Sequence, residues 1–297
     1  MDQVRIGVVG AGNIATHHLE ALSVVSGVAV VGITSRTRER AEELAVQYSI
    51  PCVADTMEDL CAHTEIDALM LLVSADQMAA VATRAMALGV PLFLEKPAGI
   101  TSQETAMLAR AAQQRSVRTM VGFNRRFFSV FQYGRAMIAR HGPLIAIAVE
   151  GHERMWKQAG GSLTDTVRRN WIFTNSVHTI DLLRFFGGEP TRVHAIAHRR
   201  FGETRGDQFA AVMELSDGAI GTYHAYWYSP GGWSVTLYGD GVTARFHPLE
   251  RGWWVDQQLV EHAIDPDPVD LQTKPGFVRQ AEAFCALVRT GTLPEDA

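Results

Sequence analysis

The feature that most constrains this chain is a glycine-rich run close to its start. Residues 8–15 read V-V-G-A-G-N-I-A, which places Gly10, Gly12 and Ala15 in the spacing G-x-G-x-x-A. The run follows a short apolar strand pattern and opens a helical pattern, the context in which this spacing carries meaning. The first glycine permits a tight turn, the second lets the backbone approach a pyrophosphate, and the small third residue lets helix and strand pack closely. The run therefore predicts a dinucleotide-binding turn.

The helix that this run opens would supply the rest of the phosphate site. Asn13 and Ile14 lie in its first turn. Backbone N–H groups there have no partner within the helix, and the helix dipole places partial positive charge at that end. We therefore expect Gly10, Gly12, Asn13 and Ile14 to bind the cofactor.

Strand and helix patterns alternate through residues 4–122. The strand patterns are short apolar runs, some without polar alternation, as expected of a parallel sheet buried on both faces. Strands are expected at residues 4–9, 28–33, 68–73, 91–94 and 118–122, and helices at 14–25, 38–48, 77–88 and 102–115. Repeated strand–helix–strand units of this length predict an α/β fold with a doubly wound parallel sheet of the Rossmann type.

The pattern changes after residue 122. Several later strand patterns alternate apolar with polar residues, and turns between them contain Ser-Asp-Gly or Gly-Asp-Gly. Strands are expected at residues 144–150, 191–198, 208–215, 219–226, 234–238 and 243–247, and helices at 127–140, 175–186 and 277–289. This pattern predicts an α+β domain with a large open, mostly antiparallel sheet. We expect a dinucleotide-binding domain over residues 1–122 and a domain for substrate binding and oligomerisation over residues 123–297.

The end of the second predicted strand indicates which dinucleotide is bound. A site that prefers NAD usually places an acidic residue about 20 positions after the glycine run, where it holds the ribose hydroxyls. Here the segment reads I-T-S-R-T-R, and the first carboxylate after it is Glu39. Ser35 and Arg36 suit a ribose 2′-phosphate instead, because a guanidinium donates charge-assisted hydrogen bonds to it. We expect NADP as the preferred cofactor, with NAD possible; the alternative is a solvated basic start of a helix.

Composition bounds the class of protein and its partners. The chain has 297 residues, a formal net charge of −5 and a pI near 6.1, so its overall charge does not favour nucleic acid or an anionic membrane. Its longest apolar runs fall far short of the roughly 20 residues of a membrane-spanning helix. The early strand pattern leaves no room for a signal peptide, and the three cysteines form no C-x-x-C pair. We expect a cytoplasmic protein with reduced thiols, a small-molecule substrate and no metal.

Three further motifs follow at characteristic spacing. Glu95-Lys96-Pro97 follows the predicted strand at residues 91–94, at the sheet edge where ligands bind in open α/β folds. The segment G-F-N-R-R-F occupies residues 122–127, and H-T-I-D-L-L begins at His178. Together with G-A-G-N-I-A, these motifs resemble in order and spacing those of the Gfo/Idh/MocA family, the relatives of glucose–fructose oxidoreductase and inositol dehydrogenase. The resemblance covers essentially the whole chain.

This resemblance implies an activity and the residues that carry it. Family members typically oxidise or reduce a carbon bearing a hydroxyl or carbonyl group on a sugar, sugar nucleotide or polyol. Lys96 is expected to touch the reacting oxygen and the cofactor, with Glu95 beside it, and His178 is expected to pass the proton. Imidazole titrates near pH 7, and an ammonium group favours an alkoxide-like transition state. Ser74 would contact the nicotinamide half of the cofactor, unless it only starts a helix.

The chain departs from the family at one position. Family dehydrogenases commonly carry an aspartate four residues before the histidine, and here that position is Thr174. Three interpretations stay open: a simpler proton relay, a substrate other than a polyol, or loss of fast turnover. Asp181 lies one turn after His178 and would either orient that histidine or brace the domain junction.

The residues expected to hold the substrate lie near the domain junction and before the histidine. Asn124 and one of the two following arginines would face the crevice, and we take Arg125 rather than Arg126. Further candidates are Trp156, Thr174 and Asn175, in a segment that also contains Arg154, Arg168, Arg169 and Trp171. Indole and arginine side chains together suit a stacked sugar ring or an anionic substrate such as a nucleotide sugar or uronate. The alternative is that the tryptophans fill the core and the arginines are solvated.

The later strands carry a cluster of aromatic residues: Tyr223, Tyr226, Trp227 and Tyr228. Aromatic residues on an open sheet more often pack against a second subunit than line a pocket. We therefore expect a homodimer or homotetramer formed through this sheet.

Two classes of function compete. The favoured one is an NADP-dependent dehydrogenase or reductase, because Lys96 and His178 are both present. The alternative is a non-catalytic NADP-binding regulator or sensor on the same scaffold, which Thr174 in place of an aspartate would favour.

Overall fold

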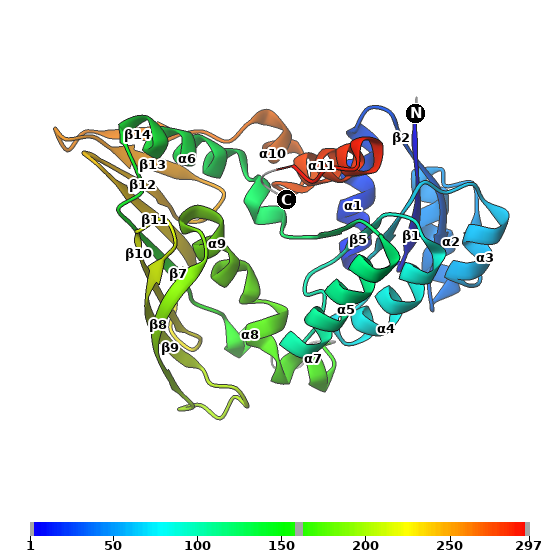
Figure 1. Cartoon of the computed structure of the whole chain (residues 1–297), viewed down its shortest axis with the longest axis horizontal. Coiled ribbons are helices and arrows are strands. Elements are labelled where there is room, and N and C mark those ends of the chain that lie inside the picture. Colours follow the sequence, from blue (N-terminus) through cyan, green and yellow to red (C-terminus); the bar gives the residue numbers. More distant parts are fainter. Residues whose placement is uncertain (1–2, 158–162, 295–297) are drawn as a thin grey trace. The chain divides into compact units, whose positions relative to one another are not determined.

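The computed structural model describes residues 3–157 and 163–294. The chain divides into two compact units (Figure 1). The first unit contains residues 1–124 and 272–297, and the second contains residues 125–271. Each unit has its own sheet and its own hydrophobic core.

The first unit is built on six parallel strands in the order β3-β2-β1-β4-β5-β6. The strands are β1 (Val4–Val9), β2 (Val28–Thr34), β3 (Val53–Ala54), β4 (Ala68–Leu71), β5 (Leu92–Leu94) and β6 (Thr119–Val121). Its helices are α1 (Asn13–Val24), α2 (Arg38–Tyr48), α3 (Met57–His63), α4 (Ala75–Ala85), the 3₁₀ turn η1 (Met86–Leu88), α5 (Ser102–Arg115) and α11 (Phe277–Thr290). This order confirms the predicted doubly wound sheet of the Rossmann type. The short elements β3 and α3 were not predicted.

Apolar sequence explains the central strands of this sheet. All four residues of β4 and all three of β5 are buried. Alternate residues of these strands pack with side chains of α4 and α5 in one apolar cluster: Leu69, Leu71, Leu92 and Leu94. Strands buried in this way read as continuous apolar runs, which is why the sequence pattern predicts them well.

The C-terminal helix belongs to the first unit, although we expected residues 123–297 to form one second domain. Helix α11 packs against α1 and β1, and Figure 1 shows it in red beside the blue N-terminal helix. The Phe284 ring centroid lies 5.5 Å from that of Phe93, and the Phe277 ring centroid lies 4.7 Å from that of His18. Burial of this apolar helix face, and not its place in the sequence, decides which unit the helix joins.

The second unit is built on eight strands in the order β14-β13-β12-β11-β7-β10-β9-β8. They are β7 (Ala146–Gly151), β8 (Pro190–His198), β9 (Gln208–Leu215), β10 (Ile220–Tyr226), β11 (Trp233–Gly239), β12 (Val242–Phe246), β13 (Gly252–Val255) and β14 (Glu261–Ile264). The helical elements are η2 (Asn124–Phe127), α6 (Ser129–His141), η3 (Met155–Lys157), α7 (Asp165–Arg169), α8 (Trp171–Thr174), α9 (Val177–Gly187) and α10 (Pro268–Gln272). Among the described strands of this sheet, only β7 and β10 pair in parallel, so the predicted mostly antiparallel sheet is confirmed. Strands β13 and β14 were not predicted.

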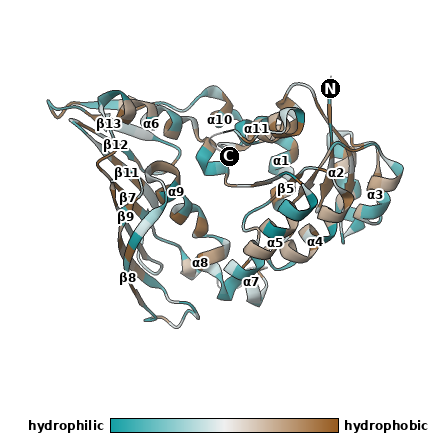
Figure 2. Ribbon diagram, in the orientation of Figure 1, coloured by the Kyte–Doolittle hydropathy of each residue, from teal (hydrophilic) through white to brown (hydrophobic). Residues whose placement is uncertain are grey.

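One face of this second sheet packs against α6 and α9. Along β7, Ile147 and Val149 are buried, while the residues between them are only partly so. Figure 2 shows hydrophobic and hydrophilic residues mixed along these strands, as expected of a sheet with one buried face.

Two of the four aromatic residues expected on the open face lie in the core instead. Tyr223 and Trp227 are 6% and 2% exposed, whereas Tyr226 is 42% exposed. Tyr228 is partly buried, and its ring stacks on that of Phe201 at 4.4 Å between centroids. Successive side chains of a strand point to opposite faces, so Tyr223 and Tyr226 cannot share one. Clustering in sequence therefore misled the prediction.

Candidate functional site

The turn after β1 has the geometry that the glycine spacing predicts. Gly10 has a φ of +109°, and a Cβ at this position would lie 2.5 Å from the Leu72 carbonyl oxygen. The Gly10 N–H donates to the Thr34 carbonyl oxygen at 2.8 Å, which ties the turn to the end of β2. Both the backbone conformation and the lack of space require glycine here.

Gly12 has a different task. It precedes α1 with an extended backbone, and a Cβ added to it would meet no heavy atom within 4 Å. Helix α1 has no side-chain cap and no acidic residue in its first turn. Ala15 is fully buried. The open space in front of Gly12 and the positive end of α1 fit a phosphate group.

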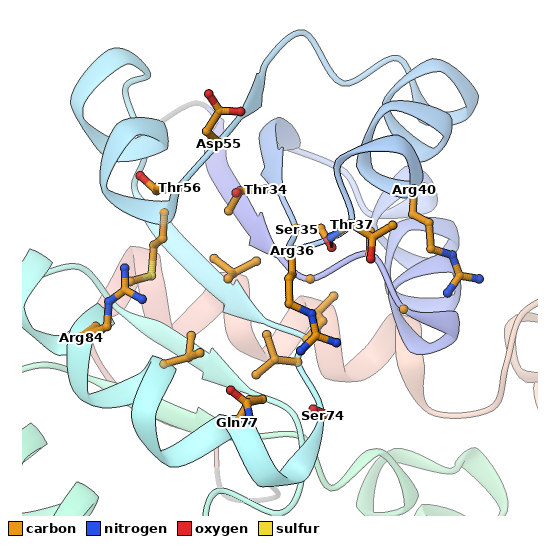
Figure 3. A pocket seen from close by; sticks show the side chains of 18 residues that line it. Thr34, Ser35, Arg36, Thr37, Arg40, Asp55, Thr56, Ser74, Gln77 and Arg84 are labelled. Atoms are coloured by element: carbon orange, nitrogen blue, oxygen red, sulfur yellow. Dashed lines mark hydrogen bonds between the residues drawn. The ribbon is translucent and has the colours of Figure 1, made fainter. Parts of the chain in front are cut away.

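A cavity of about 410 Å³ lies at the carboxyl ends of β1, β2 and β4 (Figure 3). Its lining includes Gly10, Gly12, Ser35, Arg36 and Ser74 from the predicted set, together with Thr34, Thr37, Arg40, Asp55, Gln77 and Arg84. The cavity therefore combines a glycine turn with a polar and basic far end, which fits a dinucleotide. The predicted Asn13, Ile14, Glu95 and Lys96 are not among its lining residues.

The side chains that line the cavity near the end of β2 are mainly basic, and the carboxylate among them is already in an ion pair. Asp55 is the one carboxylate among the lining residues. It forms an ion pair with Arg38, which also pairs with Glu42. Arg84 pairs with Glu58. In Figure 3 the Arg36 side chain extends across the cavity toward Ser74 and Gln77. An arginine in this position, with no unpaired acid beside it, fits an additional phosphate.

Glu95 does not line the first cavity, and its carboxylate is bound within the first unit. The residue is 6% exposed, and its carboxylate accepts from His18 Nε2 at 2.8 Å and from the Lys96 backbone N–H at 3.0 Å. The His18 ring in turn packs edge-on against Phe93 at 5.1 Å. Because its partners lie inside the unit, Glu95 braces α1 against the end of β5 and fixes the backbone from which Lys96 projects.

The second unit contains a cavity of about 660 Å³. Its lining residues come from η2, from the end of β7, from the segment before α9 and from two loops of the sheet: Arg125, His152, Glu153, Arg154, Trp171, Asn175, Gly231, Gly232, Trp233, His247, Pro248, Leu249 and Glu250. The volume suits a small polar molecule, and the lining offers hydrogen-bond donors beside two indole rings.

His178 lies next to this cavity. It is the second residue of α9, it is 4% exposed, and its ring centroid lies 6.1 Å from that of the cavity-lining Trp233. Lys96 belongs to the first unit and follows β5, where it is half-buried. The structure therefore places each expected catalytic residue at the end of an ordered element.

The two arginines at the start of the second unit have different partners. Arg125 lines the cavity, and its guanidinium lies 4.4 Å from the ring centroid of Trp233. Arg126 turns to Asp181 and donates to both carboxylate oxygens, at 2.7 and 2.6 Å. Asp181 therefore braces η2 against α9, and this favours the bracing interpretation over one in which it orients His178.

Three of the residues proposed to hold substrate do not line this cavity. Asn124 is buried and its amide donates to the Pro275 carbonyl oxygen at 3.1 Å. Trp156 is 43% exposed. Thr174 is buried and its hydroxyl donates to the Val167 carbonyl oxygen at 3.2 Å. Asn175, in contrast, lines the cavity.

Glu153 is a cavity residue that the sequence patterns did not show. Its side chain is 6% exposed and accepts from the Asn175 amide and the Ser176 hydroxyl. Burial raises the pKa of Glu153, and hydrogen bonds from Ser176 and Asn175 and the charge of Arg125 oppose that rise. No sequence motif includes Glu153. Its position just after the partly buried strand β7 was the available sign that this glutamate is buried.

Within residues 3–157 and 163–294, no three His, Cys, Asp or Glu side chains cluster so as to hold a metal ion. The three cysteines are free thiols, and burial raises the pKa of Cys285 to about 11, which makes it a poor nucleophile. No helix in the described part of the chain has the length and apolar character to cross a membrane.

The fold and the first cavity define a class of protein: chains of two units in which a Rossmann unit has a cavity that suits a dinucleotide. The model of the Gfo/Idh/MocA oxidoreductase family, NAD-binding Rossmann fold, matches residues 4–123. The model of the Gfo/Idh/MocA C-terminal domain matches residues 146–245. The chain belongs to the Gfo/Idh/MocA family of oxidoreductases.

Similar proteins include several dehydrogenases. The chain is 24% identical to 4-carboxy-2-hydroxymuconate-6-semialdehyde dehydrogenase of a Sphingobium species, over 99% of this chain and 93% of that protein. It is 28% identical to inositol 2-dehydrogenase of Rhizobium meliloti, over 69% of this chain and 61% of that protein. The names of these relatives lend no support to the alternative of a non-catalytic regulator.

Solved structures show the same fold at low identity. A putative NADPH-dependent oxidoreductase from Desulfitobacterium hafniense superimposes with a TM-score of 0.85 at 19% identity, over 99% of this chain and 90% of that chain. An oxidoreductase from Agrobacterium radiobacter in complex with NAD+, L-tartaric acid and magnesium gives 0.83 at 16% identity, over 99% of this chain and 91% of that chain. These likenesses establish the architecture of the chain.

Proposed function

We propose that this protein is an NADP-preferring dehydrogenase or reductase. It transfers a hydride between the nicotinamide ring and a hydroxyl- or carbonyl-bearing carbon of a sugar, sugar nucleotide or polyol. The observation that carries the proposal is the glycine turn at the start of α1, which opens on a cavity whose far end holds Arg36 and no unpaired acid. Similar proteins named inositol 2-dehydrogenase and UDP-N-acetylglucosamine 3-dehydrogenase support this substrate class.

Gly10, Gly12 and Ser74 would hold the phosphates and the nicotinamide half of the cofactor, and Ser35 and Arg36 its 2′-phosphate. When bound, the cofactor supplies the hydride chemistry. His178 acts as the base that takes the proton from the substrate hydroxyl, or returns it in the reverse direction. The Lys96 ammonium stabilises negative charge that develops on the reacting oxygen.

The cavity of the second unit supports a hydroxyl-bearing substrate with an acidic group. Asn175 and Arg125 can bind hydroxyl oxygens, and the indole of Trp171 offers an apolar face to a sugar ring. Arg154 is exposed at the cavity, and no ion pair within the described residues involves it. A guanidinium in this setting binds a carboxylate or a phosphate. The similar protein named for a carboxylated semialdehyde is in keeping with such a substrate.

A substrate panel tests the proposal. The protein is incubated with NADP+ or NADPH and neutral polyols, uronates and nucleotide sugars, and absorbance at the nicotinamide band is followed. We expect turnover with at least one class, a lower KM for NADP(H) than for NAD(H), and a loss of at least a hundredfold in kcat for Lys96→Ala and His178→Ala. Tight cofactor binding without turnover on the whole panel would contradict an enzymatic role.

We also propose that copies of the chain associate through the open face of the eight-stranded sheet, as a homodimer or homotetramer. Exposed apolar side chains lie on this face: Ile196, Val212, Ile220, Tyr226 and Tyr238. An apolar patch of this kind is typical of a protein interface. A cytoplasmic location is proposed on the three free thiols.

A further inference from the structure

The wall of the second cavity contains two histidines beside a pair of glycines. His152 directly follows β7, His247 directly follows β12, and both line the cavity. Gly231 and Gly232, just before β11, line it as well. A Cβ on Gly231 would lie 2.7 Å from His152 Cδ2, and a Cβ on Gly232 would lie 3.6 Å from His247 Cε1. Each imidazole therefore lies against one of the two glycines.

The ring of His152 is held in place by strand β10. The last pair of the ladder between β7 and β10 is Glu150 with His224. Beyond this pair, the Tyr226 backbone N–H donates to His152 Nδ1 at 3.0 Å, and the Tyr226 ring stacks on the His152 ring with 5.4 Å between centroids. The His152 backbone N–H donates to the Gly232 carbonyl oxygen at 3.2 Å. Both the backbone and the ring of His152 are thus fixed by neighbouring segments.

The bond from Tyr226 decides which nitrogen of His152 carries the proton. A backbone N–H can only donate, so Nδ1 accepts with its lone pair, and the proton of the neutral imidazole lies on Nε2. Burial lowers the pKa of His152, and the charges of His224 and His247 act in the same direction, whereas Glu150 opposes them. His152 is therefore neutral near neutral pH and carries an N–H at Nε2.

The Nε2–H of His152 is available to a ligand in this cavity. The side chain is half-buried and lines the cavity, and no group within residues 3–157 and 163–294 forms a hydrogen bond with its Nε2. An N–H donor whose ring is already fixed in orientation loses little conformational freedom when it binds a ligand atom.

The charge of the donor indicates which ligand atom it binds. Arg125 and Arg154 line the same cavity, and a guanidinium forms charge-assisted bonds with a carboxylate or a phosphate. A neutral imidazole N–H adds no charge, so it suits an uncharged oxygen, as in a hydroxyl or a carbonyl group. The lining thus offers cationic donors for an acidic group and a neutral donor for a second oxygen of the same molecule.

We propose that His152 is a specificity-determining residue of the second cavity, whose Nε2–H donates to a hydroxyl or carbonyl oxygen of the substrate. The backbone N–H of Tyr226 fixes the tautomer that makes this possible, and Gly231 leaves the room that the ring needs. The role in substrate binding rests on the proposed function, whereas the tautomer of His152 does not depend on it.

The first test is nitrogen NMR of the full chain with isotope-labelled histidine, which distinguishes the two neutral tautomers. His152→Asn assigns the signals of His152 by their loss. Near neutral pH we expect an Nδ1 without a proton and a protonated Nε2. A proton on Nδ1 overturns the proposal, whether the ring is then neutral or cationic.

Addition of ligands to the same labelled protein tests the contact itself. The probes are myo-inositol, D-glucuronate and UDP-N-acetylglucosamine, each added with NADPH present, because similar proteins are named for inositol and UDP-N-acetylglucosamine. At least one probe should move the Nε2 signal of His152 and leave the signals of His141, an exposed residue at the end of α6, in place. If none of the three moves the His152 signal, the proposal is overturned.

Two substitutions separate the nitrogens of the ring in turnover assays. Asparagine keeps an oxygen near the position of Nδ1 to accept from Tyr226 but has no donor near Nε2, whereas glutamine keeps an amide nitrogen near Nε2. With a substrate that turns over, His152→Asn should raise KM about 3- to 10-fold with kcat within about twofold, as expected when one neutral hydrogen bond to the substrate is lost. His152→Gln should keep KM within about twofold of the wild type. An unchanged KM in His152→Asn overturns the proposal, as does a fall in kcat alone.

His141→Asn is the matched control, because it makes the same substitution at an exposed residue that does not line the cavity. It should leave KM and kcat unchanged, and an equal rise in KM would show that the effect is not specific to His152.

Gly231→Ala serves if His152→Asn does not fold, as judged by circular dichroism. Neither Gly231 nor Gly232 has a positive φ, so alanine suits both backbones. The added Cβ at position 231 must displace the His152 ring, so KM should rise, and an unchanged KM overturns the proposal. In Gly232→Ala the Cβ makes an ordinary contact with His247 and should leave the His152 signals in place.

The readouts distinguish this inference from the proposed function. If no substrate turns over, the proposed function fails, and the NMR spectra still decide whether His152 donates to a ligand. If turnover occurs but the KM of His152→Asn matches that of the wild type, only the present inference fails.

Discussion

At the scale of single residues, the ion pairs around the first cavity decide which arginines are available to a charged ligand group. Arg38 and Arg84 also lie near the end of β2 and β4, but each is bound to a carboxylate. Arg36 stands at the same end of the cavity without an acidic partner among the described residues. A charged ligand group therefore meets an available guanidinium at position 36.

Arg36→Ala should change cofactor choice and leave the fold intact. Loss of a hydrogen bond to a charged group costs about 1.5–3 kcal/mol, so the Kd for NADPH should rise about 10- to 100-fold while that for NADH stays within about twofold. Fluorescence titration with both dinucleotides measures this. Arg110→Ala is the control, because Arg110 is an exposed residue of α5 that does not line the cavity, and no change in either Kd is expected for it. Equal loss of NADPH and NADH binding in Arg36→Ala would contradict NADP preference.

Substitutions of the two glycines of the turn should have different effects: one on the stability of the fold and the other on cofactor binding. Gly10→Ala forces a Cβ to within 2.5 Å of the Leu72 carbonyl oxygen at a φ of +109°, so we expect a loss of at least about 2 kcal/mol in the free energy of unfolding. Gly12→Ala meets no atom within 4 Å, so the fold should tolerate it, while NADPH binds at least about tenfold more weakly. Thermal unfolding and cofactor titration of both variants test this. Normal binding by Gly12→Ala would argue against pyrophosphate at this turn.

Glu153 should contribute to the pH dependence of the free energy of unfolding. Burial raises the pKa of Glu153 in the folded chain from the usual 4.5. Its contribution to stability is therefore fully present below about pH 4.5 and is lost as pH rises through the folded value. The free energy of unfolding of the wild type relative to Glu153→Gln should fall as the pH rises above about 4.5, as measured by urea denaturation. A difference that rises over this range would show that the pKa is lowered instead.

At the scale of elements, helix α9 is held at two points. Glu153 clamps the turn before it, and the ion pair of Arg126 with Asp181 joins its middle to η2. Both attachments reach residues far away in sequence, since Arg126 and Asp181 are 55 positions apart. The helix that carries His178 is thereby set from β7 on one side and from η2 on the other.

Asp181→Asn tests the second attachment. Arg126 is 19% exposed and Asp181 6%, so removal of one charge leaves the other largely desolvated, and we expect a loss of about 2–3 kcal/mol in the free energy of unfolding. Urea denaturation measures it. The exposed pair of Arg169 with Asp165, 3.9 Å apart, is the control, and Asp165→Asn should cost under about 0.5 kcal/mol. Similar losses in the two variants would show that the buried pair has no special weight.

At the scale of the whole molecule, the open face of the large sheet carries exposed apolar side chains that bear on the proposed association. Ile220 and Tyr226 of β10 are 55% and 42% exposed on it. Light scattering of the wild type should give two or four times the chain mass of 32.6 kDa, because burial of these side chains favours association. Ile220→Glu combined with Tyr226→Glu should return the mass toward that of one chain. Val46→Glu, on an 84% exposed residue of α2, should change nothing, and a monomeric wild type would rule the interface out.

Features read within a short stretch of sequence were predicted well. The glycine turn, the buried parallel strands and the helices of the first unit depend on backbone conformation and on apolar periodicity over a few residues. The bounds of β1 and the turn at Gly10 agree with expectation. Motif order was enough to place the chain in its family, because the motifs mark turns and strand ends that the fold requires.

Partners far apart in sequence were decided only by the tertiary structure. His18 and Glu95 are 77 positions apart, and Glu153 and Ser176 are 23 apart, so no local pattern joins them. The same holds for α11, which completes the core of the first unit from the end of the chain. Local sequence determines which side chains are available and how the backbone turns; packing of apolar faces over long separations decides which of those side chains meet, and so whether a glutamate braces a helix or serves a site.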